Sequence, residues 1–295
     1  MKKLFTYLMA GVLSVSLLTG CGGTDTTSDS QQAVQESIQE NSKESTEAEV
    51  VYPTGELMTP AESFAGGDGS KESPYEISTA EELYRMASMI NTYELGADKS
   101  YYVLTSDIVI NDVSNYENWE KEAPQYGWDP INSFQGNFNG NGHSITGLYC
   151  FVSGEDSTVG AGLFDNISGG TVENLNLDKA MVTRLKTAQY AGILASSVYD
   201  GEIYNCQVSG TVVGPYCGGI IGATSWSIID NCSFDGEVRN EEGGYCGGII
   251  GSASGCVVSN CSNLGAIKSV AERDTKVGGI VASFSATSMG FYLVE

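Results

Sequence analysis

Two short motifs recur along the second half of the chain, and their nearly constant spacing constrains the fold more than any other feature. The first motif is a glycine followed by two apolar residues, and its glycines lie 30, 27, 29 and 31 residues apart. The second is an aliphatic residue, any residue, an asparagine, and then leucine or cysteine. The five motif glycines are Gly162, Gly192, Gly219, Gly248 and Gly279, and the four copies of the second motif are Val172–Leu175, Ile203–Cys206, Ile229–Cys232 and Val258–Cys261. A fixed period of this kind is typical of a solenoid.

The residue types within each period favour β-strands over helices. Short runs rich in Val, Ile, Thr and Cys are broken every five to eight residues by Gly, Asn, Ser or Asp, and such runs have low helix propensity and high strand and turn propensity. We therefore predict a parallel β-helix in which each period forms one coil of about three short strands, stacked ~4.8 Å from the next. The recurring asparagine is expected to form a ladder of side-chain amides between coils.

The segment that leads into the first repeat resembles a known repeat family. Phe134-Gln135-Gly136 is followed by a run of Asn and Gly that ends at His143, then by Ile145-Thr146-Gly147-Leu148 and later by Gly162-Leu163-Phe164. This order is similar to that of the GLUG-repeat family of bacterial surface proteins, and the resemblance covers about residues 64–290. It implies a right-handed β-helix and a role at the cell surface that is often adhesive.

The chain departs from the family pattern at several repeats. The family motif ends in glycine, which Gly222 and Gly251 keep, whereas Asp165, Ala195 and Ala282 stand at the same place in the other copies. Alanine and aspartate are compatible with some turns, so the fold is still expected. No binding site can be carried over from the family.

The first 20 residues are expected to be a lipoprotein signal peptide. Lys2 and Lys3 precede an apolar stretch of about 15 residues, which is short for a spanning helix and typical of a signal-peptide core. The stretch ends in Leu18-Thr19-Gly20-Cys21, which resembles the lipobox of bacterial lipoproteins. The resemblance implies that the Cys21 thiol carries a diacylglycerol and that the signal peptide is cleaved before it. The expected location is extracytoplasmic, anchored by lipid to the cell membrane and exposed at the cell surface.

Two segments separate the lipid from the repeats. Residues 21–62 are rich in Ser, Thr, Gln and Glu and are predicted to be a disordered tether, because they offer too little apolar surface to offset the entropy of ordering. Residues 63–100 are expected to hold a strand and a capping helix. Ser78 and Glu81 have capping-box spacing, and an apolar face follows, so a helix is predicted from Thr79 to about Thr92 to cover the open end of the β-helix. Strands are predicted at Ser100–Thr105 and Asp107–Ile110, and the repeats then occupy residues 101–295.

Net charge argues against one class of partner. The formal net charge is -23, which repels nucleic-acid phosphates and anionic lipid head groups. Nucleic-acid binding is therefore not expected.

Seven cysteines follow Cys21, and their positions predict columns within the β-helix. Cys206, Cys232 and Cys261 share one repeat position, and Cys217 and Cys246 share another. Stacked neighbours would have nearly parallel Cβ vectors, too far apart for a relaxed disulfide, so buried free thiols are favoured over disulfides. Zinc is a third and weaker alternative, because no Cys-x-x-Cys pair occurs and the chain has a single histidine, His143. No metal or other cofactor is expected.

Three functions remain open. The first hypothesis is a non-enzymatic module that binds a glycan or protein on its long face, and its candidate contact residues are Tyr190, Tyr199, Tyr204, Tyr216, Trp226 and Tyr245. The second is a polysaccharide lyase or glycoside hydrolase, which requires clustered carboxylates. Its candidate acids are Asp200, Asp230 and Asp235, which lie near turns in successive coils, and aspartates at such places are usually turn formers. The third is a structural spacer or a fragment of a larger surface protein. No catalytic residue is predicted.

The apolar stretch Met289–Glu295 either caps the last coil or reflects a shortened product.

Overall fold

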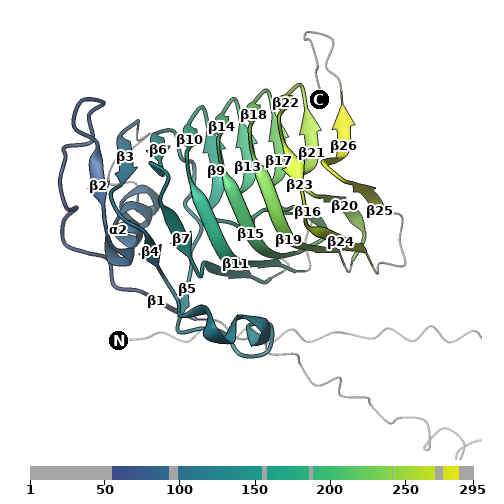
Figure 1. Cartoon of the computed structure of the whole chain (residues 1–295), viewed down its shortest axis with the longest axis horizontal. Helices are drawn as coiled ribbons and strands as arrows, with labels where there is room; N and C mark the ends of the chain where they lie inside the picture. Colours follow the sequence, from purple (N-terminus) through teal and green to yellow (C-terminus); the bar gives the residue numbers. More distant parts are fainter. Residues whose placement is uncertain are drawn as a thin grey trace, which may run out of the picture. The chain divides into compact units, whose positions relative to one another are not determined.

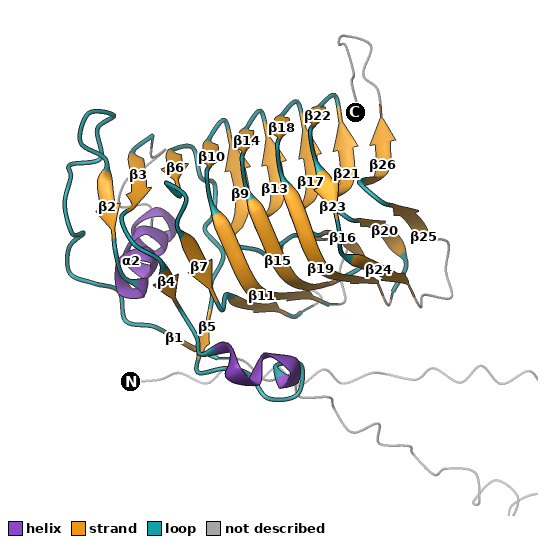
Figure 2. Ribbon diagram, in the orientation of Figure 1, coloured by secondary structure: helices purple, strands orange, loops and turns teal. Residues whose placement is uncertain are grey.

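The computed structural model describes residues 55–92, 99–154, 158–185, 189–240, 242–269 and 275–285. The predicted signal peptide, Cys21, most of the predicted tether and the segment Met289–Glu295 lie outside these ranges. All the described residues belong to one compact unit, Tyr52–Glu295. Within it, parallel strands from successive periods stack side by side, as Figures 1 and 2 show, and the predicted parallel β-helix is confirmed.

A complete coil visits four sheets in turn, rather than the three strands predicted. Sheet 1 contains β12 (Tyr190–Ala191), β16 (Tyr216–Gly218), β20 (Gly244–Gly247) and β25 (Thr275–Gly278). Sheet 2 contains β9 (Phe164–Ser168), β13 (Ala195–Tyr199), β17 (Ile221–Ser225), β21 (Ile250–Ser254) and β26 (Val281–Ser285). The Gly-apolar-apolar motif joins these two sheets, so the glycines divide what looks like one strand in the sequence into two.

The other two sheets lie on either side of the asparagine in the second motif. Sheet 3 contains β2 (Tyr75–Ile77), β3 (Tyr101–Leu104), β6 (Asn137–Asn139), β10 (Thr171–Glu173), β14 (Glu202–Tyr204), β18 (Ile228–Asp230) and β22 (Val257–Ser259). Sheet 4 contains β4 (Ile108–Val109), β7 (Ser144–Thr146), β8 (Tyr149–Val152), β11 (Asn176–Arg184), β15 (Gln207–Val213), β19 (Ser233–Asn240), β23 (Ser262–Asn263) and β24 (Ala266–Ser269). The strand pair β1 (Glu56–Leu57) and β5 (Tyr126–Gly127) lies apart from them.

The core is a set of apolar columns that run through the coils. The aliphatic residue that opens the second motif pairs in register from coil to coil. This column consists of Val172, Ile203, Ile229 and Val258, each at most 1% exposed. Because side chains alternate between the two faces of a strand, every inward position forms such a column, and the hydrophobic interior is continuous from α2 to the last described coil.

The predicted asparagine ladder is present at the turn between sheets 3 and 4. Asn205 Nδ2 donates to Asn174 Oδ1 over 3.0 Å, and Asn231 Nδ2 donates to Asn205 Oδ1 over 2.7 Å. The ladder continues through Asn174 to Asn139 at one end, whereas Asn260 bonds to Asp230 at the other. Each motif asparagine has a φ between 51° and 54°, the left-handed region that asparagine tolerates better than most residues.

Helix α2 (Ala80–Asn91) covers the N-terminal end of the core, as predicted, with Thr79 and Thr92 as its caps. Leu83, Met86 and Ile90 are buried against the first coils. The predicted capping box of Ser78 and Glu81 was wrong by one residue: Thr79 and Glu82 form it, because the helix begins at Ala80 and Glu82 is therefore the third helical residue.

Two predicted boundaries are also corrected. Residues 55–62 were assigned to the disordered tether, yet Glu56–Leu57 pairs with Tyr126–Gly127, and the Ala61 backbone bonds to Glu81 and Arg85. Backbone pairing of this kind needs no apolar side chains, so composition does not reveal it. The repeats were expected to start at residue 101, but β2 is already a strand of sheet 3.

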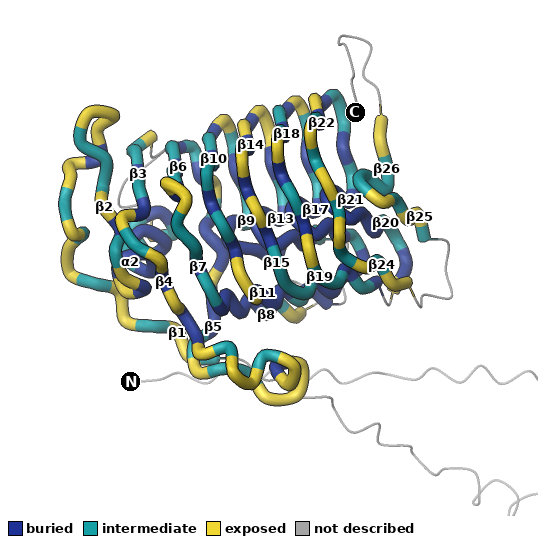
Figure 3. The backbone as a smooth tube through the Cα atoms, viewed as in Figure 1, coloured by how far each residue is buried: buried dark blue, intermediate teal, exposed yellow. Residues whose placement is uncertain are grey.

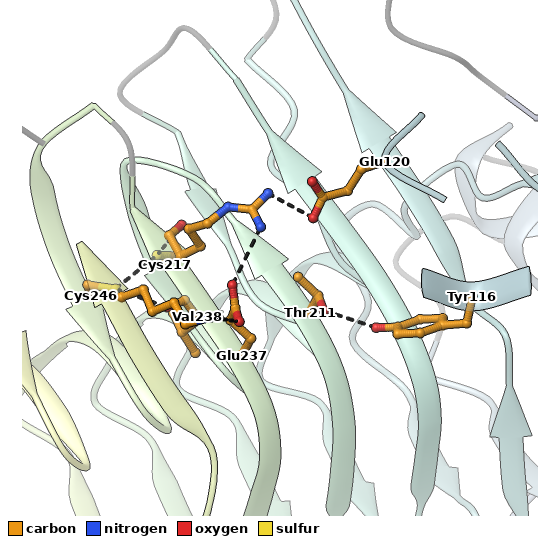
Figure 4. Close-up of polar contacts among 9 residues, drawn as sticks. Tyr116, Glu120, Thr211, Cys217, Glu237, Val238 and Cys246 are labelled. Atoms are coloured by element: carbon orange, nitrogen blue, oxygen red, sulfur yellow. Dashed lines mark hydrogen bonds and ion pairs between the residues drawn. The ribbon is translucent and has the colours of Figure 1, made fainter. Parts of the chain in front are cut away.

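An insertion between β4 and β5 braces the outside of sheet 4. It contains the 3-10 helix η1 (Val113–Asn118), from which Tyr116 Oη donates to the Ala180 carbonyl over 2.8 Å and lies within hydrogen-bond distance of Thr211 Oγ1, at 3.1 Å. Glu120 pairs with Arg239 over 2.9 Å, and Arg239 also lies 3.5 Å from Glu237 (Figure 4). The insertion therefore connects β11, β15 and β19, and nothing in the repeat pattern predicted it.

The cysteines form the predicted columns as free thiols. Cys217 pairs in register with Cys246, and their sulfur atoms lie 3.7 Å apart, well beyond the length of a disulfide bond. Six of the seven thiols are buried and Cys261 is half-buried. Burial raises the pKa of Cys150 to about 12, because the thiolate would lose its hydration.

Replacement of Asn205 tests the ladder. Asn205→Ala removes two side-chain hydrogen bonds and leaves a Cβ residue at a φ of 53°, so the free energy of unfolding should fall by about 2 kcal/mol. Asn205→Gly loses the same bonds but adopts this φ freely, so its loss should be about half as large. Urea unfolding of both variants measures the difference, and equal losses would show that backbone conformation contributes nothing.

The state of the cysteines can be counted with a thiol reagent. In the native chain at pH 8 we expect a chromogenic disulfide reagent to react rapidly with Cys21 where that thiol is unmodified and only slowly with Cys261, because the hydrogen bond with Cys232 and partial burial raise the pKa of the Cys261 thiol. The other six thiols are buried and should not react. In denaturant without reductant, all seven cysteines from Cys150 onward should react. A smaller count after denaturation, restored by prior reduction, would instead show disulfides between coils.

Candidate functional site

A polar groove of about 390 Å³ runs along the outer face of sheet 4. Its polar side chains come from β7, β11, β15 and β19, which lie next to one another in Figures 1 and 3, and Leu264 lies between β23 and β24. They are hydroxyls, amides and carboxylates, with one apolar side chain at the far end. The set is Ser144, Asn176, Asp178, Gln207, Ser209, Ser233, Asp235 and Leu264.

Register places the polar groups of the groove in two rows. Asn176 pairs with Ser144 on one side and with Gln207 on the other, and Gln207 pairs with Ser233. The second row contains Asp178, Ser209 and Asp235, of which the last two are direct partners. A ligand that lies along the helix axis would therefore meet a polar side chain at every coil, at intervals of ~4.8 Å.

A bend in sheet 4 borders the groove. Lys179 has a φ of 47° and Gly210 a φ of 142°, and the register between β11 and β15 shifts between Leu177 and Ala180. A Cβ on Gly210 would overlap the carbonyl oxygen of Ala180, so only glycine allows the coils to approach this closely. The bend turns the strand after Asp178 and Ser209, at the edge of the row they form.

Some groove side chains are held in place and others are available. Ser209 Oγ donates to Asp178 Oδ1 over 2.7 Å, and Asn176 Nδ2 donates to the Gly142 carbonyl over 2.9 Å. Gln207, Ser233 and Asp235 have no side-chain hydrogen bond within the described residues. The groove thus combines a fixed carboxylate with free amide, hydroxyl and carboxylate groups, and no Lys or Arg lines it.

The three aspartates considered from the sequence do not form one cluster. Asp200 occupies a turn with a φ of 51°, and Asp230 accepts hydrogen bonds from Ser259 and Asn260, which lower the pKa of its carboxyl group. Only Asp235 lies in the groove, where Asp178 accompanies it. Asp178 was not among the predicted residues, although the polar-apolar-polar alternation after each motif asparagine indicates that its side chain points outward.

The six candidate aromatic residues lie in three places rather than on one face. Tyr190, Tyr216 and Tyr245 pair in register on sheet 1, half-buried, with ring centroids 5.9 and 5.5 Å apart in edge-to-face contact. Tyr204 lies on sheet 3. Tyr199 and Trp226, at the turn between sheets 2 and 3, are 54% and 45% exposed. None of the six lines the groove.

Metal-ligating residues are scattered in the part of the chain that the structure describes, where no group of three His, Cys, Asp or Glu side chains could hold an ion. His143 Nδ1 lies 3.4 Å from Asp107 Oδ1 at the surface. The pKa of Asp107 is lowered, first by hydrogen bonds from Ser144 and then by His143.

Comparison with known proteins finds two relatives by sequence and one similar fold, and the chain matches no protein-family profile. It is 34% identical over 166 residues to a protein of Evansella cellulosilytica provisionally named as a Gly-rich membrane protein, which covers 54% of this chain and 17% of the relative. It is 31% identical over 163 residues to halomucin of Haloquadratum walsbyi, which covers 53% of this chain and 2% of that protein. The matches therefore span a small part of much longer proteins.

A solved structure supports the fold. The crystal structure of a protein from Bacteroides ovatus, provisionally named as an immunoglobulin A1 protease, aligns with a TM-score of 0.59 and 24% sequence identity. The alignment covers 75% of this chain and 65% of that one. At this level of identity the likeness concerns the fold and carries no activity across.

Proposed function

We propose that this protein is a lipid-anchored protein of the bacterial cell surface that binds a neutral glycan in the groove of sheet 4. The observation that carries the proposal is the groove itself, in which hydroxyl, amide and carboxylate groups form rows along the helix axis. From Ser144 to Leu264 the groove crosses five successive coils, or roughly 19 Å. This length suits several units of an extended polymer.

The chemistry of the groove favours a ligand rich in hydroxyl groups. Amides and carboxylates both accept hydrogen bonds from sugar hydroxyls, and amides and serine hydroxyls also donate. Asp178 and Asp235, with no Lys or Arg among the lining residues, would repel a sulfated or uronic-acid polymer. A neutral glycan therefore fits better than an anionic one.

A surface location is supported by two independent observations. The residues around Cys21 resemble a lipobox, which supplies an anchor that needs no spanning helix. The name of the Evansella cellulosilytica relative includes a membrane location. Among the described residues, no helix is long and apolar enough to cross a membrane.

A second function has one specific observation in its favour. Asp178 and Asp235 lie two coils apart in the same groove, with Ser209 between them, so their backbones are separated by roughly 9–10 Å. Inverting glycosidases hold their two carboxyl groups about 6.5–9.5 Å apart. Glycan hydrolysis would thus use the same groove as glycan binding, with these two residues as acid and base.

Glycan binding is tested on an array of neutral and anionic bacterial, plant and host glycans with the purified chain in mild detergent. We expect saturable binding to one neutral class. Asn176→Ala and Gln207→Ala should each raise the dissociation constant about tenfold, because each removes a hydrogen bond to the glycan worth about 1–1.5 kcal/mol.

Gln125→Ala is the matched control, because Gln125 is exposed outside the groove and its side chain bonds only to the Tyr126 hydroxyl among the described residues. Binding that persists unchanged in both groove variants would contradict the proposal. Shorter fragments of the bound glycan that disappear in Asp178→Asn and Asp235→Asn would instead establish the hydrolase.

Lipid attachment is tested with Cys21→Ser in cells that express the chain and are fed an alkyne fatty acid. The unsubstituted chain should incorporate the label and sediment with membranes, whereas Cys21→Ser should lose the label because serine offers no thiol for thioether formation. Cys261→Ser provides the control for general loss of a cysteine. Label retained in Cys21→Ser would exclude this residue as the acylation site.

A further inference from the structure

An exposed apolar patch lies outside the groove, where sheet 2 turns into sheet 3. Trp226 is 45% exposed and Val257 37% exposed, and Val257 pairs in register with the half-buried Ile228. Tyr199, at 54% exposure, is paired with Ser225, directly before Trp226. Contiguous exposed apolar side chains of this kind mark interaction surfaces. We call this set, Tyr199, Trp226, Ile228 and Val257, the sheet 3 patch.

Trp226 occupies a position that suits a much smaller residue. Its φ is 58°. The equivalent position in the turns of other coils is occupied by Gly169, Asp200 and Gly255, with φ values of 74°, 51° and 65°. A bulky side chain at such a φ is strained, and here the strain is not offset by burial. The other two tryptophans of the chain, Trp119 and Trp128, are 1% and 4% exposed. Packing therefore does not explain why this coil has tryptophan where its neighbours have glycine or aspartate.

The surroundings of the patch carry one sign of charge. The seven strands of sheet 3 contain no Lys or Arg. Glu202 is exposed and pairs in register with Ile228, and Tyr204 beside it pairs with Asp230. Asp200 lies at the turn, in the coil before Trp226. An apolar centre is thus bordered by carboxylates, with no cation to neutralise them on the strands of this sheet.

We propose that the sheet 3 patch docks a protein segment in which basic and apolar side chains alternate. In an extended segment, the apolar side chains on one face would cover Trp226, Ile228 and Val257. The long Lys or Arg side chains start on the other face and would fold back over the border to Asp200 and Glu202. Tryptophan and tyrosine are the residues most often responsible for binding energy at protein interfaces. The carboxylates repel nucleic acid and anionic lipid, so a cationic polypeptide is the partner that both features fit.

Trp226 also provides the measurement. Because Trp119 and Trp128 are buried, quenching by the neutral quencher acrylamide reports mainly on Trp226. The probe is a blocked octapeptide of alternating lysine and leucine, added to the purified chain in mild detergent. We expect the peptide to protect Trp226 from acrylamide quenching in a saturable way. The dissociation constant from this titration should equal the one measured by fluorescence anisotropy of a dye-labelled peptide.

Two variants on the patch should weaken binding without unfolding the protein. Trp226→Gly should raise the dissociation constant at least tenfold in the anisotropy assay, while the melting temperature stays the same or rises, because glycine relieves the strained φ. Glu202→Gln should raise it about threefold. Leu57→Gly and Glu56→Gln are matched controls, because both residues are exposed on β1, outside sheet 3, and they should leave binding unchanged.

Two further peptides separate this proposal from simple attraction to an acidic protein. Alternating lysine and serine should bind at least tenfold more weakly than lysine and leucine, and alternating glutamate and leucine should not bind. The proposal is overturned if the lysine-leucine peptide does not bind, if Trp226→Gly binds it as tightly as the unsubstituted chain, or if the lysine-serine peptide binds equally well.

Discussion

In-register stacking of successive coils is the constraint on which the rest of the structure depends. Ile220 bonds through its backbone to Ile249, as Leu194 does to Ile220, and a strand within a coil has no other partner for its backbone groups. A shift by one residue would turn every inward side chain to solvent. Each position of the repeat therefore becomes a column along the axis, and the columns of isoleucine, asparagine, cysteine and tyrosine are all consequences of this one register.

The asparagine turn shows how strongly a column is determined. Asn174, Asn205 and Asn231 each combine a left-handed backbone with a side-chain amide that bonds to the next coil. Glycine satisfies the first requirement and most polar residues could satisfy the second, but asparagine satisfies both. At Asn260 the ladder departs from this pattern, because the bond goes to Asp230. The Asp230 carboxylate therefore bonds to the next coil, and its position near a turn has a structural explanation.

The repeat motifs and the apolar face of the helix predicted most of the architecture, and the features that were missed are those that no motif indicates. The β-helix, the asparagine ladder and the cysteine columns follow from the spacing and the residue types of the repeats, and the capping helix follows from the apolar face of Leu83, Met86 and Ile90. The fourth sheet was missed because the glycine pairs Gly218-Gly219 and Gly247-Gly248 look like the interior of one strand. The insertion that carries Tyr116 and Glu120 was missed because its partners, Thr211 and Arg239, lie in distant coils.

The groove was the hardest feature to foresee, for a related reason. Asp178, Ser209 and Asp235 occupy one row, but the bend at Lys179 and Gly210 that borders the groove, and the register shift there, leave no pattern in the sequence. In a solenoid a column with one residue type in every coil usually serves stability, since each copy repeats the same contact. A row of Asp, Ser and Asp does not repeat one contact from coil to coil. The same is true of the turn position that is Gly, Asp, Trp and Gly in successive coils. Such departures from the column are where a β-helix can carry a ligand-specific surface, and in this chain they lie on two different sides of the coil.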